Sequence, residues 1–344
     1  MTRQANGRRL NGRRDNGGII GVIGCGVTGS RVVTTLTAAD RRVAVYDPRA
    51  VSVSKEVVRV DDPSDLATCD VIVLAQPTPH APLVQRLLQS GTSLVSLSDN
   101  LDDVRALLSL HAEAVANGAV LVVGGGVAPG LSGLLARYLA AQLHTLDELH
   151  VAIHGTAGPE CARQHHNALG DTALGWHDNE WIEPPGGSGR DLVWFPEPVA
   201  AHDCYRAALA DPLLLQQAFP TASRISARVS ATRRDRLTAR LPMLLPPHAS
   251  GDLGAVRVEA RGANATGGRE TLMAGAAAPT AELAAAVAVA IAVSLVDGES
   301  ANQPAAGAYG TADAALEPLE LLRKATEHGV RVQEFTGVAR ATSW

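Results

Sequence analysis

The sequence predicts an α/β protein with a doubly wound parallel sheet at its N-terminus and a second α+β domain built on a largely antiparallel sheet. Three observations support this prediction. A glycine-rich turn follows the first apolar segment, strand-like and helix-like segments alternate as far as residue 123, and one-sidedly apolar strands appear only later. Apolar strands that alternate with amphipathic helices indicate a parallel sheet that is covered on both faces.

The first elements form a dinucleotide-binding unit. A strand predicted over residues 19–23 runs directly into Gly24-Cys25-Gly26-Val27-Thr28-Gly29. A helix over residues 30–39 and a second strand over residues 42–46 follow. A Gly-x-Gly-x-x-Gly turn is weak evidence by itself, but here it lies between a strand and a helix, as nucleotide binding requires.

Each glycine of this turn has a separate physical role. Gly24 makes the tight turn, Gly26 lets a pyrophosphate approach the backbone, and Gly29 lets the helix pack closely on the strand. The helix N-terminus then offers unpaired N–H groups and a positive dipole end to the phosphates. We therefore expect NAD or NADP here, in preference to a flavin or to a turn without a ligand. The remaining predicted coenzyme contacts in the turn are Cys25, Val27 and Thr28.

Two residues after the second strand bear on the choice of coenzyme. Asp47 lies about 20 residues after the turn, where an acid accepts hydrogen bonds from the adenosine ribose. A carboxylate there repels a 2′-phosphate and favours NAD. Arg49 could instead stack on adenine or neutralise such a phosphate. NAD is therefore the favoured cofactor, and NADP is the alternative.

The alternation continues to residue 123. The predicted strands cover residues 57–60, 70–75, 93–97 and 119–123, and the predicted helices cover 63–68, 81–89 and 101–116. Ligands of doubly wound sheets bind at the carboxyl ends of the strands. We therefore predict that Gln76 and Pro77 lie along the nicotinamide ribose, and that Ser98 and Asp99 lie near the nicotinamide. Asp99 is equally suited to cap the following helix.

The pattern changes after residue 125. The segments expected in the second part are helices over 131–143 and 160–169, strands over 149–154, 222–231 and 255–263, a core helix over 281–296, and a final helix and strand over 316–327 and 330–335. We expect a disordered tail over 1–18, an NAD(P)-binding domain over 19–125, a substrate and dimerisation domain over 126–300, and a C-terminal segment over 301–344 that returns to the first domain.

The densest polar cluster follows the strand over residues 149–154. His154 or His165 is the preferred proton donor or acceptor, because the pKa of histidine suits transfer near neutral pH. Arg163 could hold a substrate carboxylate in its guanidinium fork. Cys161 and His165 are four residues apart, as zinc ligands on one helix face can be, but no second ligand pair follows and we predict no metal. The alternative is a solvated helix start whose histidines have no special role. His80 is a further candidate histidine.

Two segments resemble the saccharopine dehydrogenase-like oxidoreductases. They are residues 22–29 and the turn Gly126-Val127-Ala128-Pro129-Gly130-Leu131-Ser132, which enters a helix. The C-terminal Gly329-Val330 is a weaker match, and residues 150–270 are only generically similar. The resemblance implies hydride transfer between nicotinamide and a small amino- or imino-acid-like substrate bound between two domains. A non-catalytic NAD(P)-binding sensor or assembly protein is the alternative.

This sequence lacks the reactive residues of three other dehydrogenase families. Short-chain dehydrogenases need a lysine four residues after a tyrosine, and no tyrosine of this chain has one. Sugar dehydrogenases of the Gfo/Idh type carry Glu-Lys-Pro where this chain has Leu97-Ser98-Asp99. Homoserine dehydrogenases use a lysine in the substrate domain, and residues 150–270 contain none.

Composition limits the partners of the chain. A net charge of −5 gives no reason to expect nucleic acid or an anionic membrane, and residues 281–296 are too few to span a bilayer. Four cysteines without a Cys-x-x-Cys pair suggest a reducing cytoplasm. We expect a homodimer that binds a small-molecule substrate. Trp176, Trp181 and Trp194 suit either a lid over the cleft or a dimerisation arm.

Overall fold

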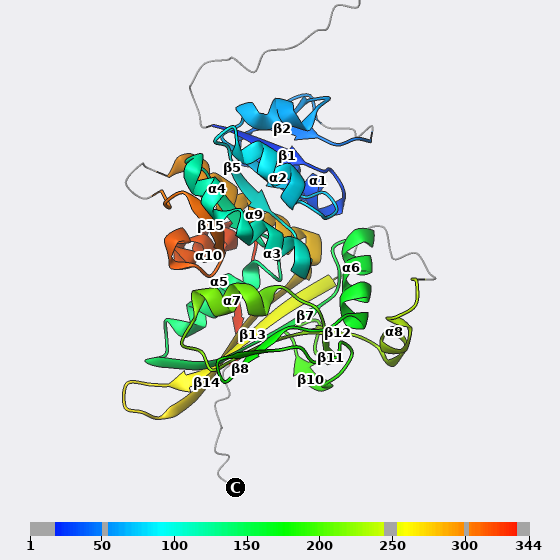
Figure 1. Ribbon diagram of the computed structural model, residues 1–344, viewed down its shortest axis with the longest axis vertical. Helices are drawn as coiled ribbons and strands as arrows, with labels where there is room; N and C mark the ends of the chain where they lie inside the picture. Colours follow the sequence, from blue (N-terminus) through cyan, green and yellow to red (C-terminus); the bar gives the residue numbers. More distant parts are fainter. Residues whose placement is uncertain (1–17, 50–53, 244–252, 299–302, 336–344) are drawn as a thin grey trace, which may run out of the picture.

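The computed structural model describes residues 18–49, 54–243, 253–298 and 303–335, and the account below concerns these residues (Figure 1). They form two sheets. The first is a seven-stranded parallel sheet in the order β15-β6-β5-β4-β1-β2-β3. This order confirms the doubly wound prediction. The strands are β1 (Ile19–Ile23), β2 (Arg42–Tyr46), β3 (Val58–Arg59), β4 (Val71–Leu74), β5 (Ser93–Ser96), β6 (Val120–Val123) and β15 (Gly307–Gly310).

Helices cover both faces of the first sheet. On one face lie α1 (Val27–Ala38) and α9 (Thr280–Asp297), and on the other lie α2 (Ala81–Leu88), α3 (Leu101–Ser109) and α4 (His111–Ala116). The single helix predicted over 101–116 is divided in two at Leu110. A 3₁₀ segment, η1 (Pro63–Thr68), precedes β4.

Helix α9 is a core helix, as its sequence predicts. The helix is two residues longer than the segment 281–296 and, against the expectation, is long and apolar enough to cross a membrane by length and composition, but 67% of it is buried inside the protein. It packs on α1, β4 and β5 of the first sheet and also contacts β14. The boundary expected at residue 300 assigns this helix to the second domain, although it packs mainly on α1 and on the later helix α10 (Pro318–Glu327) and also contacts β4 and β5 of the first sheet.

The second sheet is largely antiparallel, as expected, with one parallel pair between β7 and β12. Its path is β10-β11-β12-β7-β13-β14-β16, and β8 and β9 extend from β12. The strands are β7 (Thr145–His154), β8 (Gly175–His177), β9 (Glu180–Ile182), β10 (Asp191–Trp194), β11 (Ala201–Arg206), β12 (Arg224–Ser230), β13 (Leu253–Ala263), β14 (Arg269–Pro279) and β16 (Gln333–Glu334).

The remaining helices connect the two sheets or flank the second one. They are α5 (Leu131–Ala140), α6 (Pro159–Gly170), α7 (Asp211–Ala218), α8 (Arg233–Thr238), η2 (Ala314–Leu316) and α10 (Pro318–Glu327). Helix α5 packs on β13, α7 and α10, and one apolar core continues from the first sheet through α9 and α5 to the second. In Figure 1 the blue and cyan first sheet lies above the green and yellow second sheet, and α6 stands beside both.

The chain leaves the first sheet after β6 and returns to it at β15. Strand β15 runs parallel to β6, with Gly307 opposite Val120. The C-terminal segment was expected to return to the first domain, and β15 lies there. The later strand β16 instead pairs with β14 of the second sheet. The second sheet is therefore an insertion between two neighbouring strands of the first.

Candidate coenzyme and substrate cavity

A cavity of about 940 Å³ lies between the two sheets. Its walls come from the glycine turn after β1, the loops that follow β4 and β5, the end of β7, and the start of α6. The carboxyl ends of the parallel strands therefore open into it, which is where doubly wound sheets bind ligands. Volumes of this size are typical of small-molecule and cofactor sites.

The glycine turn is open to the cavity. A Cβ at Gly24, whose φ is +91°, would lie 2.7 Å from the Gln76 nitrogen, and a Cβ at Gly29 would lie 1.8 Å from the Gly24 oxygen. A Cβ at Gly26 would meet no atom within 4 Å. Gly24 and Gly29 are therefore needed for the turn itself, whereas Gly26 keeps free the space in front of α1. No side chain caps this helix end, which leaves its amides available to an anion.

Asp47 is buried behind this turn and is held by several donors. Its carboxylate accepts hydrogen bonds from the Cys25 nitrogen at 2.7 Å and the Arg49 nitrogen at 2.8 Å. The Arg49 guanidinium adds two bonds, from Nε and Nη2, both at 3.0 Å. The bonds from Arg49 lower the pKa of Asp47 to about 2. Because a carboxylate has about four acceptor positions, the predicted contact with the ribose requires Arg49 to move aside.

Cys25 fills space between the turn and Asp47. Burial, with a smaller effect of the Asp47 charge, raises the pKa of its thiol to about 11. The thiol therefore stays protonated at neutral pH, and its backbone nitrogen is the group that contacts Asp47.

The His80 side chain joins the loop after β4 to the end of β5 through its two ring nitrogens. Its Nε2 lies 2.9 Å from the Gln76 carbonyl oxygen, and its Nδ1 lies 2.8 Å from Ser96 Oγ. A carbonyl only accepts hydrogen bonds, so Nε2 carries the proton and Nδ1 accepts from the serine. Burial lowers the pKa of His80, which keeps the ring neutral. This candidate histidine therefore positions the backbone of Gln76, which lines the cavity with Pro77.

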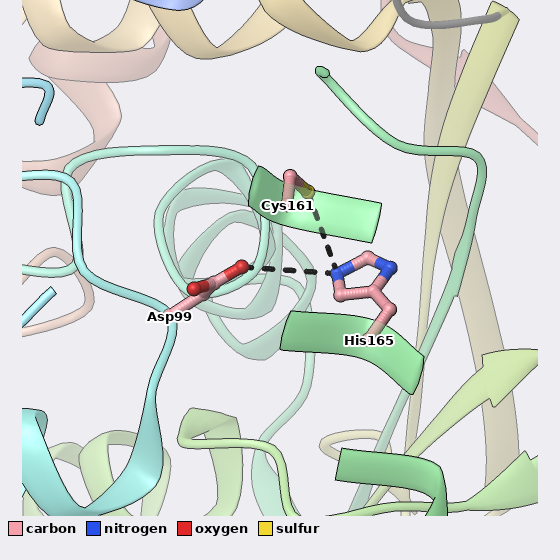
Figure 2. Close-up of side chains that lie close together, drawn as sticks. All are labelled: Asp99, Cys161 and His165. Carbon is pink, nitrogen blue, oxygen red and sulfur yellow. Dashed lines mark hydrogen bonds and ion pairs between the residues drawn. The ribbon is translucent and has the colours of Figure 1, made fainter. Parts of the chain in front are cut away.

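Three reactive side chains that line the cavity converge on one another (Figure 2). His165 Nε2 lies 3.8 Å from Cys161 Sγ and 3.8 Å from Asp99 Oδ2. The three ligand atoms all lie within 4.8 Å of one another. Cys161 and His165 come from consecutive turns of α6, and Asp99 comes from the loop after β5. The structure thus brings together residues that are more than 60 positions apart in the sequence.

The charges of this cluster are coupled. Burial opposes a charge on His165, but the Cys161 and Asp99 groups outweigh it and raise the pKa of His165 to about 9. Burial raises the pKa of Asp99. Asp99 does not cap α3, because the Asn100 side chain accepts the hydrogen bond from the Asp103 nitrogen. The carboxylate of Asp99 is therefore not used as a helix cap, and Asp99 lines the cavity.

Comparison with solved structures identifies the architecture. The apo saccharopine dehydrogenase (L-Glu forming) of Saccharomyces cerevisiae superposes with a TM-score of 0.69, at 16% sequence identity, over 93% of this chain and 100% of that chain. This chain has the saccharopine dehydrogenase fold. A probable dehydrogenase from Thermotoga maritima aligns over 74% of each chain at 14% identity, with a TM-score of only 0.41, and we draw no conclusion from it.

Sequence comparison adds information on the N-terminal part alone. The family described as D-isomer specific 2-hydroxyacid dehydrogenase, NAD binding domain, matches residues 2–84. No curated protein sequence matches the chain. The family match ends in α2, so it covers the glycine turn and Asp47 but none of the residues on α6.

Asp211 is a buried acid near this cluster that the sequence did not suggest, and it is not among the residues that line the cavity. It lies at the start of α7, and Ser132 Oγ donates a hydrogen bond to its Oδ1. Its Oδ2 is buried without a partner among the described residues. Burial raises the pKa of Asp211 to about 6, and the nearby charges of Asp99 and His165 act on it as well. An aspartate before a proline at a helix start normally indicates only a helix terminus, so the sequence carries no functional signal here.

The other predicted residues lie around the same cavity. His154 lines it at the end of β7, with Nδ1 2.8 Å from Ser230 Oγ and its ring stacked on His202 at 4.0 Å. Arg163 is half-exposed on α6 and forms an ion pair with Glu160. In this arrangement His154 is held by the second sheet, whereas Arg163 is free to reorient at the surface.

Two further features concern closure of the cavity. Gln164 Nε2 on α6 donates to Thr78 Oγ1 at 2.9 Å, which joins α6 to the loop after β4. The three tryptophans suggested as a lid or an arm are not among the described residues that line the cavity. Trp176 packs on Trp181, with ring centroids 5.0 Å apart, and Trp194 lies exposed on β10.

Proposed function

We propose that this protein is an NAD(P)-dependent oxidoreductase that transfers a hydride between nicotinamide and a small amino- or imino-acid-like substrate. One observation carries the proposal: a single cavity joins the open glycine turn to the cluster of Asp99, Cys161 and His165. The saccharopine dehydrogenase fold and the match to an NAD-binding domain support the same class of reaction. The cofactor supplies the redox chemistry, and the protein supplies orientation and proton transfer.

The coenzyme position follows from the walls of the cavity. The pyrophosphate would rest on the first amides of α1, the nicotinamide ribose along Gln76 and Pro77, and the nicotinamide beside Ser98. Ser98 is buried, and its Oγ has no hydrogen-bond partner among the described residues. It can therefore donate to a bound coenzyme. The substrate would lie between the nicotinamide and α6.

We assign the remaining roles by charge and position. His154 or His165 transfers the proton that accompanies the hydride, and Arg163 at the cavity mouth pairs with a substrate carboxylate. We propose that Arg49 decides the coenzyme. Its guanidinium neutralises Asp47, so the repulsion on which the preference for NAD rested is weakened and a 2′-phosphate can be accepted. The free cysteines at the four described positions suit the cytoplasm, where we expect the protein to act.

The test is a pair of glycine variants. Gly26→Val fits the structure, because Gly26 has ordinary extended dihedrals and open space in front of it. We expect its melting temperature to match the parent while NADH and NADPH bind at least about tenfold more weakly. Gly29→Ala should lower stability as well, by about 1–3 kcal/mol, because its Cβ would overlap the Gly24 oxygen.

Fluorescence titration of both reduced coenzymes, with thermal melts of the same samples, gives the result. Parental affinity in Gly26→Val would mean that no diphosphate uses this turn, and the oxidoreductase proposal would fail. Coenzyme binding without turnover of amino, imino or oxo acids would instead favour a non-catalytic sensor.

A further inference from the structure

The geometry points to a zinc site formed by Asp99, Cys161 and His165, with its fourth coordination position open to the cavity. A thiolate, an imidazole and a carboxylate are all zinc ligands, and three protein ligands with an open position are characteristic of catalytic zinc. The sequence supplied only the Cys161 and His165 pair. The third ligand comes from another element of the fold, and Figure 2 shows the three side chains facing one another.

The distances suit a metal better than a hydrogen-bonded triad. In a nucleophile triad the acid and the thiol contact different nitrogens of the imidazole. Here Asp99 Oδ2 and Cys161 Sγ both face the same nitrogen, Nε2 of His165, at 3.8 Å each. One N–H group can point at only one of them. A sulfur, a carboxylate oxygen and a ring nitrogen that face a common point leave room for a cation, and the thiol and the imidazole would lose their protons on binding it.

The cluster is close to the size that zinc requires. Bonds of about 2.0–2.3 Å in a tetrahedron place the ligand atoms roughly 3.3–3.6 Å apart. The separations of 3.8 Å from Nε2 would therefore contract by a few tenths of an ångström on binding. One helix, α6, holds Cys161 and His165 at a spacing of four residues, so small side-chain rotations bring their ligand atoms together, and the loop that carries Asp99 closes the remaining distance.

Ligand chemistry selects zinc over harder cations. Magnesium and calcium take oxygen ligands almost exclusively, whereas this site offers one sulfur and one nitrogen. All three residues line the cavity that reaches the glycine turn. A metal here would therefore face the space in which the substrate is proposed to lie.

The use of the metal rests on the proposed function. Zinc would bind the carbonyl oxygen or imine nitrogen of the substrate and polarise its double bond. Hydride from NAD(P)H then adds to the carbon, the π electron pair moves to the zinc-bound atom, and that atom takes a proton, leaving NAD(P)⁺. With His165 engaged as a ligand, His154 is the histidine left for proton transfer.

The experiment measures zinc directly and not through activity. Purified full-length protein is stripped with a chelator, titrated with Zn²⁺ against a chromophoric competitor, and assayed for bound metal. We expect one zinc per chain, with affinity at least about a hundredfold weaker in Cys161→Ser and His165→Ala, because each loses one ligand. His166→Ala is the matched control, since the neighbouring His166 points away and bonds to the Leu241 oxygen. It should bind zinc like the parent.

Cobalt provides a second readout. Co²⁺ in the parent should show thiolate charge-transfer absorption that is absent in Cys161→Ser. Equal zinc affinity in the parent, Cys161→Ser and His165→Ala, or a cobalt spectrum without the thiolate band, would overturn the assignment. NADPH fluorescence titration of the same samples separates the two proposals. A parent protein that binds coenzyme but no zinc rejects only the metal site. A parent protein that binds zinc but no coenzyme rejects only the oxidoreductase.

Discussion

Arg49 covers the carboxylate on which coenzyme choice depends. It fills two acceptor positions of Asp47 with its side chain and a third with its backbone nitrogen. The side chain is 69% exposed, so it can leave Asp47 without breaking the core. Under the proposed coenzyme position, an arginine at the surface sets the charge that meets the adenosine 2′ position, although the buried residue is an acid.

Removing this arginine should change the coenzyme preference. In Arg49→Ala, Asp47 is uncovered, so we expect NADPH to bind about tenfold more weakly while NADH binds as well as in the parent or better. Fluorescence titration of both coenzymes measures the ratio. Arg59→Ala is the control, because Arg59 bonds to the Arg49 backbone oxygen and not to Asp47. An unchanged ratio in Arg49→Ala would remove Arg49 from coenzyme selection.

Asp211 should destabilise the protein at neutral pH. Its pKa is raised to about 6 in the folded chain, so the folded state holds this proton more tightly than the unfolded state. The corresponding stability is fully present below the ordinary pKa of about 4 and is lost as the pH rises through about 6. Asp211→Asn keeps an acceptor for Ser132 and removes this loss.

We therefore expect Asp211→Asn to be more stable than the parent at pH 8, by about 2 kcal/mol, and equally stable at pH 4. Urea unfolding in the presence of a chelator measures the difference at each pH. A gain that does not depend on pH would show that burial of the charge is not its cause. The Asp211 carboxyl is buried where the charges of Asp99 and His165 reach it, and groups with shifted pKa values are common at functional sites.

Helix α6 carries most of the substrate side of the cavity on one face. Cys161, Gln164 and His165 all line the cavity, and the bond from Gln164 to Thr78 fixes the helix against the loop after β4. The position of this helix therefore determines both the width of the cavity and the distance between the proposed zinc ligands and the proposed nicotinamide site.

Loss of that bond should affect binding more than folding. Thr78→Val keeps the shape of the side chain and removes one hydrogen bond, which contributes about 1 kcal/mol. We expect coenzyme to bind about fivefold more weakly and the melting temperature to fall by no more than about 2 °C. Gln164→Leu in the Thr78→Val background should add nothing further, as a double-mutant cycle would show. Additive losses would mean that the two side chains act separately.

Sequence patterns predicted the elements whose signals are local. The unit from β1 to β2 was predicted to within a few residues, because the glycine turn and the apolar runs lie within the segment itself. Strand β14 was missed, since Ala and Gly dominate Ala274–Ala278 and have low strand propensity. It forms because β13 pairs with it along its whole length.

The site also contains residues with a local sequence signal and residues that only the fold brings together. The residues that line the cavity at the glycine turn could be predicted because a motif with fixed spacing encodes the turn, and their contact with a coenzyme stays a prediction. The cluster of Asp99, Cys161 and His165 depends on the approach of α6 to the end of β5, and no spacing in the sequence records that approach. Asp211 was missed for the same reason, because its partner Ser132 lies on another helix, α5.

Homodimer formation remains a prediction at the scale of the whole molecule. Strand β10 ends the path of the second sheet and pairs only with β11 among the described strands. It carries Leu192 and Trp194, which are 57% and 59% exposed. An apolar edge strand is a template for pairing with another chain, and we propose a second copy of this one.

Light scattering should give twice the chain mass of 35.7 kDa for the parent and a single chain mass for Trp194→Glu. Leu237→Glu on α8 is the control, because Leu237 is 76% exposed and lies on a helix and not on the edge strand. A dimeric Trp194→Glu would place the interface elsewhere. Zinc and coenzyme binding should be unaffected, since no residue of β10 is among those that line the cavity.

The insertion of the second sheet between β6 and β15 has a consequence for synthesis on the ribosome. Six strands of the first sheet emerge early, but β15 emerges only after all of the second sheet except β16. Until then β6 offers a bare edge to any neighbouring polypeptide. The first sheet of the nascent protein therefore cannot be completed until β15 is synthesised. A chain released before Gly307 would leave the edge of β6 without its partner strand.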